Sequence, residues 1–150
     1  MKLQKQPNNW SCLPTAFAMA LDMDVKNLIN LLGHDGSEII WPDKKEPFNR
    51  RSFHIQEFID FCYSCDYAII QIDNYFKSQP DNFSKPFVVM NQNFEKIIYR
   101  NIGVLIGIGN QSSRNHAVAW NGIEIFDPNG SIYKLQDMEI SDFYCLRKLQ

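Results

Sequence analysis

The spacing of apolar residues changes after about residue 65 from a helical period to a strand-like period. In residues 12–23, 24–32 and 55–65, apolar side chains recur every three or four positions, which predicts helices with one buried face. The later apolar segments are short and rich in β-branched and aromatic residues, as strands are. Helices followed by strands predict an α+β domain in which N-terminal helices pack on a mainly antiparallel sheet.

The predicted elements are bounded by residues that favour caps and turns. Ser11 is a predicted N-cap for the first helix, and Gly33 is a predicted stop for the second. The stretch 34–53 holds glycine, proline and scattered charge, which indicates a long loop, a feature that is often functional. A further short helix is expected at 94–100. The segments with the strand pattern are 67–72, 87–90, 104–108, 116–120, 123–126 and 143–147.

The size and composition of the chain fit one globular domain, 1–150. The apolar fraction of 45% and the charged fraction of 21% are ordinary for such a domain. A net charge of −2 gives no basic field for nucleic acid. No apolar segment approaches the roughly 20 residues of a membrane span, and no secretory signal is visible. We therefore expect a cytoplasmic protein with reduced cysteines and with no nucleic-acid or membrane partner.

The dipeptide Asn121-Gly122 predicts a two-residue hairpin turn. In that register Trp120 faces Ile123, and His116 faces Asp127 on the same side of the hairpin. A carboxylate in that position can fix the imidazole tautomer and support the imidazolium, leaving the other ring nitrogen for a thiol. The alternative interpretation is a hydrogen-bonded His-Asp pair with a structural role only.

Cys12 stands where a polar, turn-rich entry gives way to an apolar helical run. Helix N-termini favour a thiolate, and this position therefore suits a cysteine nucleophile. The side-chain amide of Gln6 and the backbone N–H of Cys12 could together donate to a developing oxyanion. The alternative interpretation is that Cys12 is a small buried apolar residue, the usual fate of a free cysteine.

Three segments resemble a known family. Residues 12–21 are similar to the Cys-Gly-Pro-Thr/Ala-Ser-Leu-Ala-Met segment of the bacteriocin-leader-processing (double-glycine) peptidases and their stand-alone relatives, which belong to the papain-like superfamily. His116-Ala117-Val118 and Asp127-Pro128-Asn129-Gly130 are similar to the His-x-Val and Asp-Pro-x-x-Gly segments of that family. Leu13 stands where the family has glycine, a difference that concerns the substrate class.

The resemblance implies a papain-like fold and a cysteine peptidase-like hydrolase with no cofactor. It assigns Cys12 as the nucleophile, His116 as general base and acid, Asp127 as the orienting residue and Gln6 as the oxyanion donor. The substrate would be a peptide or protein. Isopeptidase, amidase and acyltransferase chemistry use the same parts and remain open. A non-catalytic binding or inhibitory module on the same scaffold also remains open, with Leu13 and the 34–54 loop as its support.

The remaining sequence candidates predict neither a metal ion nor a cofactor. Cys62 and Cys65 form a CxxC pair without a second ligand pair at zinc-site spacing, so ordinary thiols are expected. The glycines at 33 and 36 lack the lysine and hydroxyl residue of a phosphate-binding loop. His34 and His54 lie in or beside the long loop, where they could contact a substrate or be simply solvated.

Overall fold

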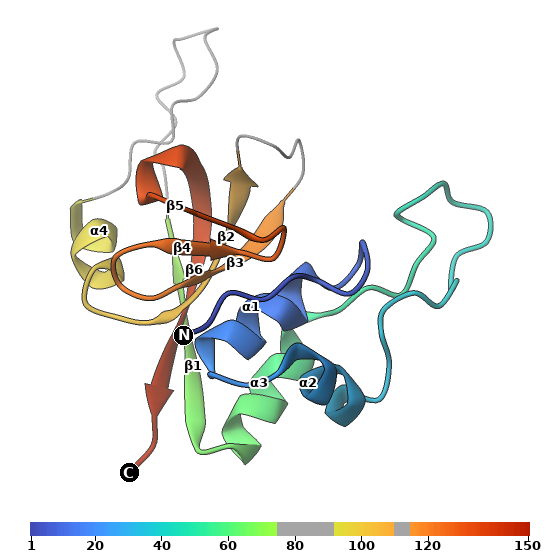
Figure 1. The fold of residues 1–150 in the computed structure, drawn as a ribbon, viewed down its shortest axis with the longest axis horizontal. Coiled ribbons are helices and arrows are strands. Elements are labelled where there is room, and N and C mark those ends of the chain that lie inside the picture. The colour runs from blue at the N-terminus through green and yellow to red at the C-terminus, as the bar shows by residue number, and fades with distance from the viewer. Residues whose placement is uncertain (75–91, 110–114) are drawn as a thin grey trace, which may run out of the picture.

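Three helices cover one face of a six-stranded antiparallel sheet, and a fourth helix lies against the other face (Figure 1). This computed structural model describes residues 1–74, 92–109 and 115–150. The expected α+β class is confirmed, and the strand predicted at 87–90 lies outside the described residues. The described helices are α1 (Cys12–Ala20), α2 (Val25–Leu32), α3 (Ile55–Ser64) and α4 (Gln92–Ile98). No helix in these ranges is both long and apolar enough to cross a bilayer.

The strands follow the order β1-β6-β2-β3-β4-β5, and every neighbouring pair is antiparallel. Strand β6 is longer than the predicted 143–147, because its first half alternates buried apolar and exposed polar residues. The short strand β5 was not predicted. The bounds are β1 (Tyr67–Asp73), β2 (Gly103–Gly109), β3 (His116–Trp120), β4 (Ile125–Asp127), β5 (Ser131–Tyr133) and β6 (Met138–Lys148).

The core consists of two apolar clusters, one on each face of the sheet. The cluster under α1, α2 and α3 includes Phe17, Phe58 and Ala119, while the cluster under α4 includes Ile98 and Trp120. Alternate residues of β3 therefore enter opposite clusters, as the two-residue period of a strand requires. All five residues of β3 are at least partly buried, so the strand that begins at His116 is enclosed by the core on both sides.

Helix α1 is apolar on nearly all sides, and residues 14–19 are all buried. A helix of this kind lies inside a protein and not on its surface. It packs against β3 and α2 and ends at Ala20, short of the predicted residue 23, because the chain turns through a positive φ of 59° at Asp22. The N-terminus of α1 is thereby brought against the sheet strand that carries His116.

The observed ends of α2 agree closely with the helix predicted at 24–32. The Oδ1 of Asp24 accepts hydrogen bonds from the backbone N–H groups of Lys26 and Asn27, at 2.9 and 3.1 Å. This is N-cap geometry, so α2 begins at Val25. Gly33 ends the helix with φ at +83°, a conformation that glycine adopts without steric cost.

The predicted register of the β3–β4 hairpin is wrong by two residues. Trp120 pairs with Ile125, and the connection therefore has four residues, 121–124. The Oδ1 of Asn121 accepts hydrogen bonds from the backbone N–H groups of Ile123 and Glu124, at 2.8 and 2.7 Å, and this stabilises the longer loop. Ile123 is 69% exposed and does not face Trp120.

Gly107 allows β2 and β6 to approach closely at an irregularity in their pairing. A Cβ at Gly107 would lie 1.9 Å from the carbonyl oxygen of Glu139, which belongs to the neighbouring backbone and cannot turn away. We expect Gly107→Ala to lower the free energy of unfolding by about 3 kcal/mol, measured by urea denaturation. Gly109→Ala is the matched control, because its nearest neighbour would be Tyr133 Oη at 3.7 Å. Equal stability of the two variants would contradict the prediction.

Candidate active site

Cys12 is the first residue of α1 and is partly exposed. Burial raises the pKa of its thiol, but four interactions together lower that pKa below its usual value. They are a hydrogen bond with the His116 ring, a hydrogen bond from the backbone N–H of Ala117, the nearby charge of His116, and a hydrogen bond from the N–H of Leu13. Each favours the thiolate, which is the nucleophilic form of cysteine.

The backbone leading into Cys12 is fixed by a small polar network. The Oγ of Ser11 donates to the carbonyl of Asn8 at 3.0 Å and accepts from the Asn8 N–H at 3.2 Å. The Oγ1 of Thr15 donates to the carbonyl of Ser11 at 2.7 Å. Ser11 holds the predicted N-cap position, but it uses its hydroxyl for this turn and makes no side-chain cap bond. The hydrogen bonds of the buried residues Ser11 and Thr15 therefore hold in place the backbone that carries the Cys12 thiol.

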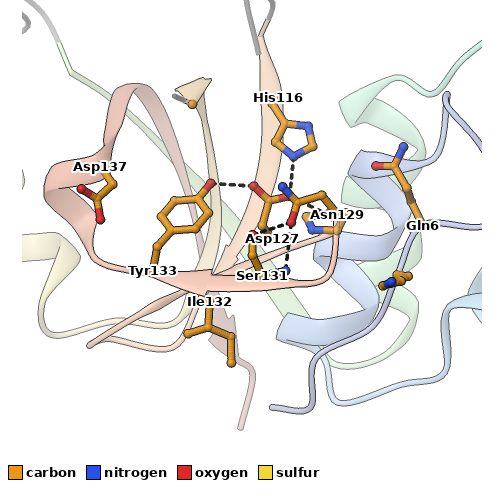
Figure 2. A pocket seen from close by; sticks show the side chains of 11 residues that line it. Gln6, His116, Asp127, Asn129, Ser131, Ile132, Tyr133 and Asp137 are labelled. Carbon is orange, nitrogen blue, oxygen red and sulfur yellow. Dashed lines mark hydrogen bonds and ion pairs between the residues drawn. The ribbon is translucent and has the colours of Figure 1, made fainter. Parts of the chain in front are cut away.

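His116 and Asp127 meet as a hydrogen-bonded pair (Figure 2). Their Nε2 and Oδ1 atoms are 2.8 Å apart, and the side chains are 18% and 4% exposed. In the observed register Asp127 is directly opposite Val118 on the neighbouring strand. Asp127 is therefore a diagonal neighbour of His116 and not its directly opposed residue. The shift of two residues leaves both side chains on the same face, and the ring nitrogen Nδ1 remains for the thiol.

The electrostatics of this pair favour an imidazolium. Burial lowers the pKa of His116, but the hydrogen bonds and charges of Asp127 and Cys12 outweigh it and raise the pKa to about 9. Burial raises the pKa of Asp127, and hydrogen bonds from His116, Tyr133 and the Asn129 N–H lower it below its usual value. The shifts of Cys12 and His116 therefore both act toward a thiolate beside an imidazolium, with the Asp127 carboxylate supporting the charged ring.

Asp127 is almost fully buried and is held by three donors. Its Oδ1 accepts from His116 and from the backbone N–H of Asn129 at 2.8 Å, while its Oδ2 accepts from the Tyr133 hydroxyl at 2.6 Å. Sequence reasoning did not identify Tyr133. Its position beside Asp127 follows from the three-residue hairpin loop Pro128-Asn129-Gly130, in which Gly130 has a φ of +98°.

That hairpin fixes the position of Tyr133. Asp127 pairs with Ser131, and Ile125 pairs with Tyr133, so the tyrosine extends from the same face as Asp127. A proline, an asparagine and a glycine after a short apolar strand form a hairpin signal. That signal was available in the sequence and could have located both β5 and Tyr133.

Gln6 lies beside the same hairpin. Its backbone N–H donates to the carbonyl of Pro128 at 2.8 Å, and its side-chain Nε2 donates to the carbonyl of Asn8 at 2.9 Å. A primary amide carries two donor hydrogens, so this bond leaves one for another acceptor. The structure thus brings the segment before Cys12 next to the loop that follows Asp127.

A pocket of about 610 Å³ opens beside the His-Asp pair (Figure 2). His116, Asp127 and Gln6 line it together with Tyr133, but Cys12 is not among its lining residues. The pocket therefore borders the imidazole and carboxylate and does not lie over the thiol. Its other lining residues are Lys5, Gly109, Pro128, Asn129, Ser131, Ile132 and Asp137.

The two histidines outside this cluster stabilise the long loop and α3. The Nε2 of His34 contacts Glu57 Oε1 at 2.6 Å, and its Nδ1 accepts from the Gly36 N–H at 3.1 Å. The other carboxylate oxygen of Glu57 accepts from the N–H of His54, the N-cap of α3, at 2.8 Å. Both ring nitrogens of His34 are thus occupied by partners in the long loop and α3.

The other three cysteines lack the environment of Cys12. All four are free thiols. Burial raises the pKa of Cys62 to about 12, and burial also raises the pKa of Cys145. Cys65 is exposed. Among the described residues, no group of three or more His, Cys, Asp or Glu side chains could hold a metal ion.

In comparisons with known proteins, no family model, no curated protein sequence and no solved structure matches this chain.

Proposed function

We propose that this protein is a thiol-dependent hydrolase of the papain-like kind, with Cys12 as nucleophile, His116 as base and acid, and Asp127 as the orienting carboxylate. The observation that carries the proposal is the hydrogen-bonded series from the Cys12 thiol through His116 to the buried Asp127. A nucleophile, a base and an orienting group in this order are the parts of covalent acyl transfer. A helix that begins at the thiol and packs on an antiparallel sheet supports the papain-like assignment.

The proposed reaction has two steps. The Cys12 thiolate adds to the carbonyl carbon of a peptide or amide, the tetrahedral intermediate collapses, and the C–N bond breaks as His116 protonates the leaving amine. Water then adds to the thioester carbon as His116 accepts one of its protons, the C–S bond breaks, and the carboxylic acid leaves, which restores the Cys12 thiolate beside the His116 imidazolium. Gln6 Nε2 and the Cys12 backbone N–H are the proposed donors to the oxyanion in both steps.

Selective alkylation tests the nucleophile directly. We expect iodoacetamide at pH 6 to modify Cys12 more than about tenfold faster than the exposed Cys65, because the His116 ring and two backbone N–H groups lower the pKa of the Cys12 thiol. Mass spectrometry of tryptic peptides after timed quenching gives both rates from one sample. Cys65 is the internal control for access. A Cys12 rate equal to or below the Cys65 rate would refute the proposal.

The pH dependence of the same reaction tests the role of His116. A lowered Cys12 pKa means that the thiolate persists below the usual range and is lost only as the pH falls through the lowered value. In His116→Ala the hydrogen bond and charge of the ring are absent, so the midpoint should rise toward the usual thiol value of about 8.5. An unchanged midpoint in this variant would show that His116 does not stabilise the thiolate.

One observation favours a second function, a binding module that acts through the long loop. Residues 34–54 display exposed apolar side chains, with Trp41 54% and Phe48 67% exposed. The loop is nevertheless ordered, since the N–H groups of Ile40 and Trp41 both donate to the carbonyl of Asn49 at 2.9 and 3.1 Å. The Arg50 guanidinium lies 4.7 Å from the Trp10 ring centroid, which joins the loop to the segment before Cys12.

The two functions are separable by paired variants in cells that respond to the protein. A hydrolase should lose its effect in Cys12→Ala and retain its fold. A binding module should keep its effect in Cys12→Ala and lose it in Trp41→Ala, whose side chain is half exposed and contributes little to the core.

A further inference from the structure

We propose that Tyr133 is a positioning residue of this site, whose hydroxyl holds the Asp127 carboxylate in the orientation that presents Oδ1 to His116. The inference rests on the proposed hydrolase function. It concerns a residue that acts through Asp127 and makes no contact with the thiol in the proposed reaction.

The carboxylate of Asp127 has two oxygens with different tasks. Oδ1 serves the imidazole, while Oδ2 accepts the Tyr133 hydroxyl at 2.6 Å, a short distance typical of a charge-assisted hydrogen bond. The terminal torsion of an aspartate is broad, so the carboxylate plane is set by its hydrogen bonds and not by a rotamer well. The Asn129 N–H fixes Oδ1 alone, and Tyr133 supplies the second point that defines the plane.

The environment keeps Tyr133 in the donor role. Burial, together with the hydrogen bond to Asp127 and the charges of Asp127 and Asp137, raises the pKa of Tyr133 well above its usual value. The hydroxyl therefore stays protonated wherever a thiolate–imidazolium pair exists, and it donates to Oδ2 throughout that range. Removing this hydroxyl would leave a nearly fully buried carboxylate oxygen without its hydrogen bond.

Tyr133 also lines the pocket that borders the His-Asp pair. It belongs to the short edge strand β5. Figure 2 shows its hydroxyl pointing at Asp127, with the ring lying between that carboxylate and Asp137. The phenol ring thus forms part of the pocket wall while its hydroxyl is committed to the carboxylate.

The test compares Tyr133→Phe with Tyr144→Phe, a control that removes the hydroxyl of a buried tyrosine in the other core cluster. Without the Tyr133 hydroxyl, the Asp127 carboxylate should stabilise the His116 imidazolium less, and the imidazolium should in turn stabilise the Cys12 thiolate less. The pH midpoint of Cys12 alkylation should therefore be higher in Tyr133→Phe than in the wild type. At pH 6 we expect alkylation to slow by about tenfold, the effect of losing one hydrogen bond to a charged group. Tyr144→Phe should match wild type.

A variant cycle separates positioning from a general loss of stability. If Tyr133 acts through Asp127, adding Tyr133→Phe to Asp127→Asn should slow alkylation no further than Asp127→Asn alone, because the group it positions is already changed. Additive losses would overturn the inference. A Tyr133→Phe profile that matches wild type, or a Tyr144→Phe profile that shifts equally, would also overturn it.

These outcomes are distinct from failure of the proposed function. If wild-type Cys12 reacts no faster than Cys65, the hydrolase proposal fails, and the positioning proposal fails with it. If wild-type Cys12 is selectively reactive but Tyr133→Phe leaves the midpoint unmoved, only the role of Tyr133 is refuted.

Discussion

Replacing Cys12 by alanine is expected to lower the rate of amide hydrolysis by at least about 10⁴-fold, the scale of losing a covalent nucleophile. The reason is that no other thiol can substitute for it: Cys62 and Cys145 are buried with raised pKa values, and Cys65 lies at the end of α3. The measurement is mass-spectrometric detection of new termini or released amines in a mixed peptide library.

The control for this variant is Cys65→Ala, which removes an exposed thiol outside the site. It should hydrolyse the same library at the wild-type rate. Retained hydrolysis in Cys12→Ala, with circular dichroism confirming the fold, would rule out the acyl-enzyme mechanism. Cys12→Ser is a useful companion, because the hydroxyl keeps the size of the side chain while its high pKa removes the preformed anion.

Asp127→Asn is expected to reduce turnover by about 10³- to 10⁴-fold near neutral pH, the scale seen when the orienting carboxylate of a catalytic triad is lost. The hydrogen bond from His116 to Asp127 is the largest of the causes that raise the pKa of His116 to about 9, and the charge of Asp127 adds to it. Without them the imidazolium should be lost as the pH rises through a lower value, nearer its usual 6.5 or so. The defect should therefore be largest between those two pH values.

A full pH profile of single-turnover hydrolysis provides the check. In the wild type the His116 imidazolium, which protonates the leaving amine, should lose its proton only as the pH rises through about 9. Asp127→Asn should lose activity at a lower pH, and Tyr133→Phe should lie between the two. Identical alkaline limits in wild type and Asp127→Asn would show that Asp127 does not support the imidazolium.

The sequence could predict the His116–Asp127 pair because the prediction needs only that both side chains lie on the same face of the hairpin. That condition depends on whether the register is shifted by an even or an odd number of residues, and not on the exact register. The turn has four residues and not two, yet a two-residue shift returns every side chain to the same face. The shift was missed because the Asn121 side chain, and not a tight Asn-Gly turn, caps the loop. A one-residue error would have placed Asp127 on the opposite face from His116.

The contact between Cys12 and His116 could not follow from local patterns. These residues are 104 positions apart in the chain, and they meet because the buried helix α1 packs on β3. Composition shows that α1 is apolar, but tertiary packing decides which strand it covers. The resemblance to known peptidases suggested this contact, and the geometry of the described residues is compatible with it.

The core cluster under α1, α2 and α3 has a consequence for when the site around Cys12 can form during synthesis. Helices α1, α2 and α3 occur within the first 64 residues, but the surfaces that they cover are on β1, β2, β3, β4 and β6. An emerging chain has Cys12 long before it has His116, Asp127 or the sheet. Until the last strand is in place, the thiol should behave as an ordinary unfolded cysteine, so its reactivity reports completion of the native domain.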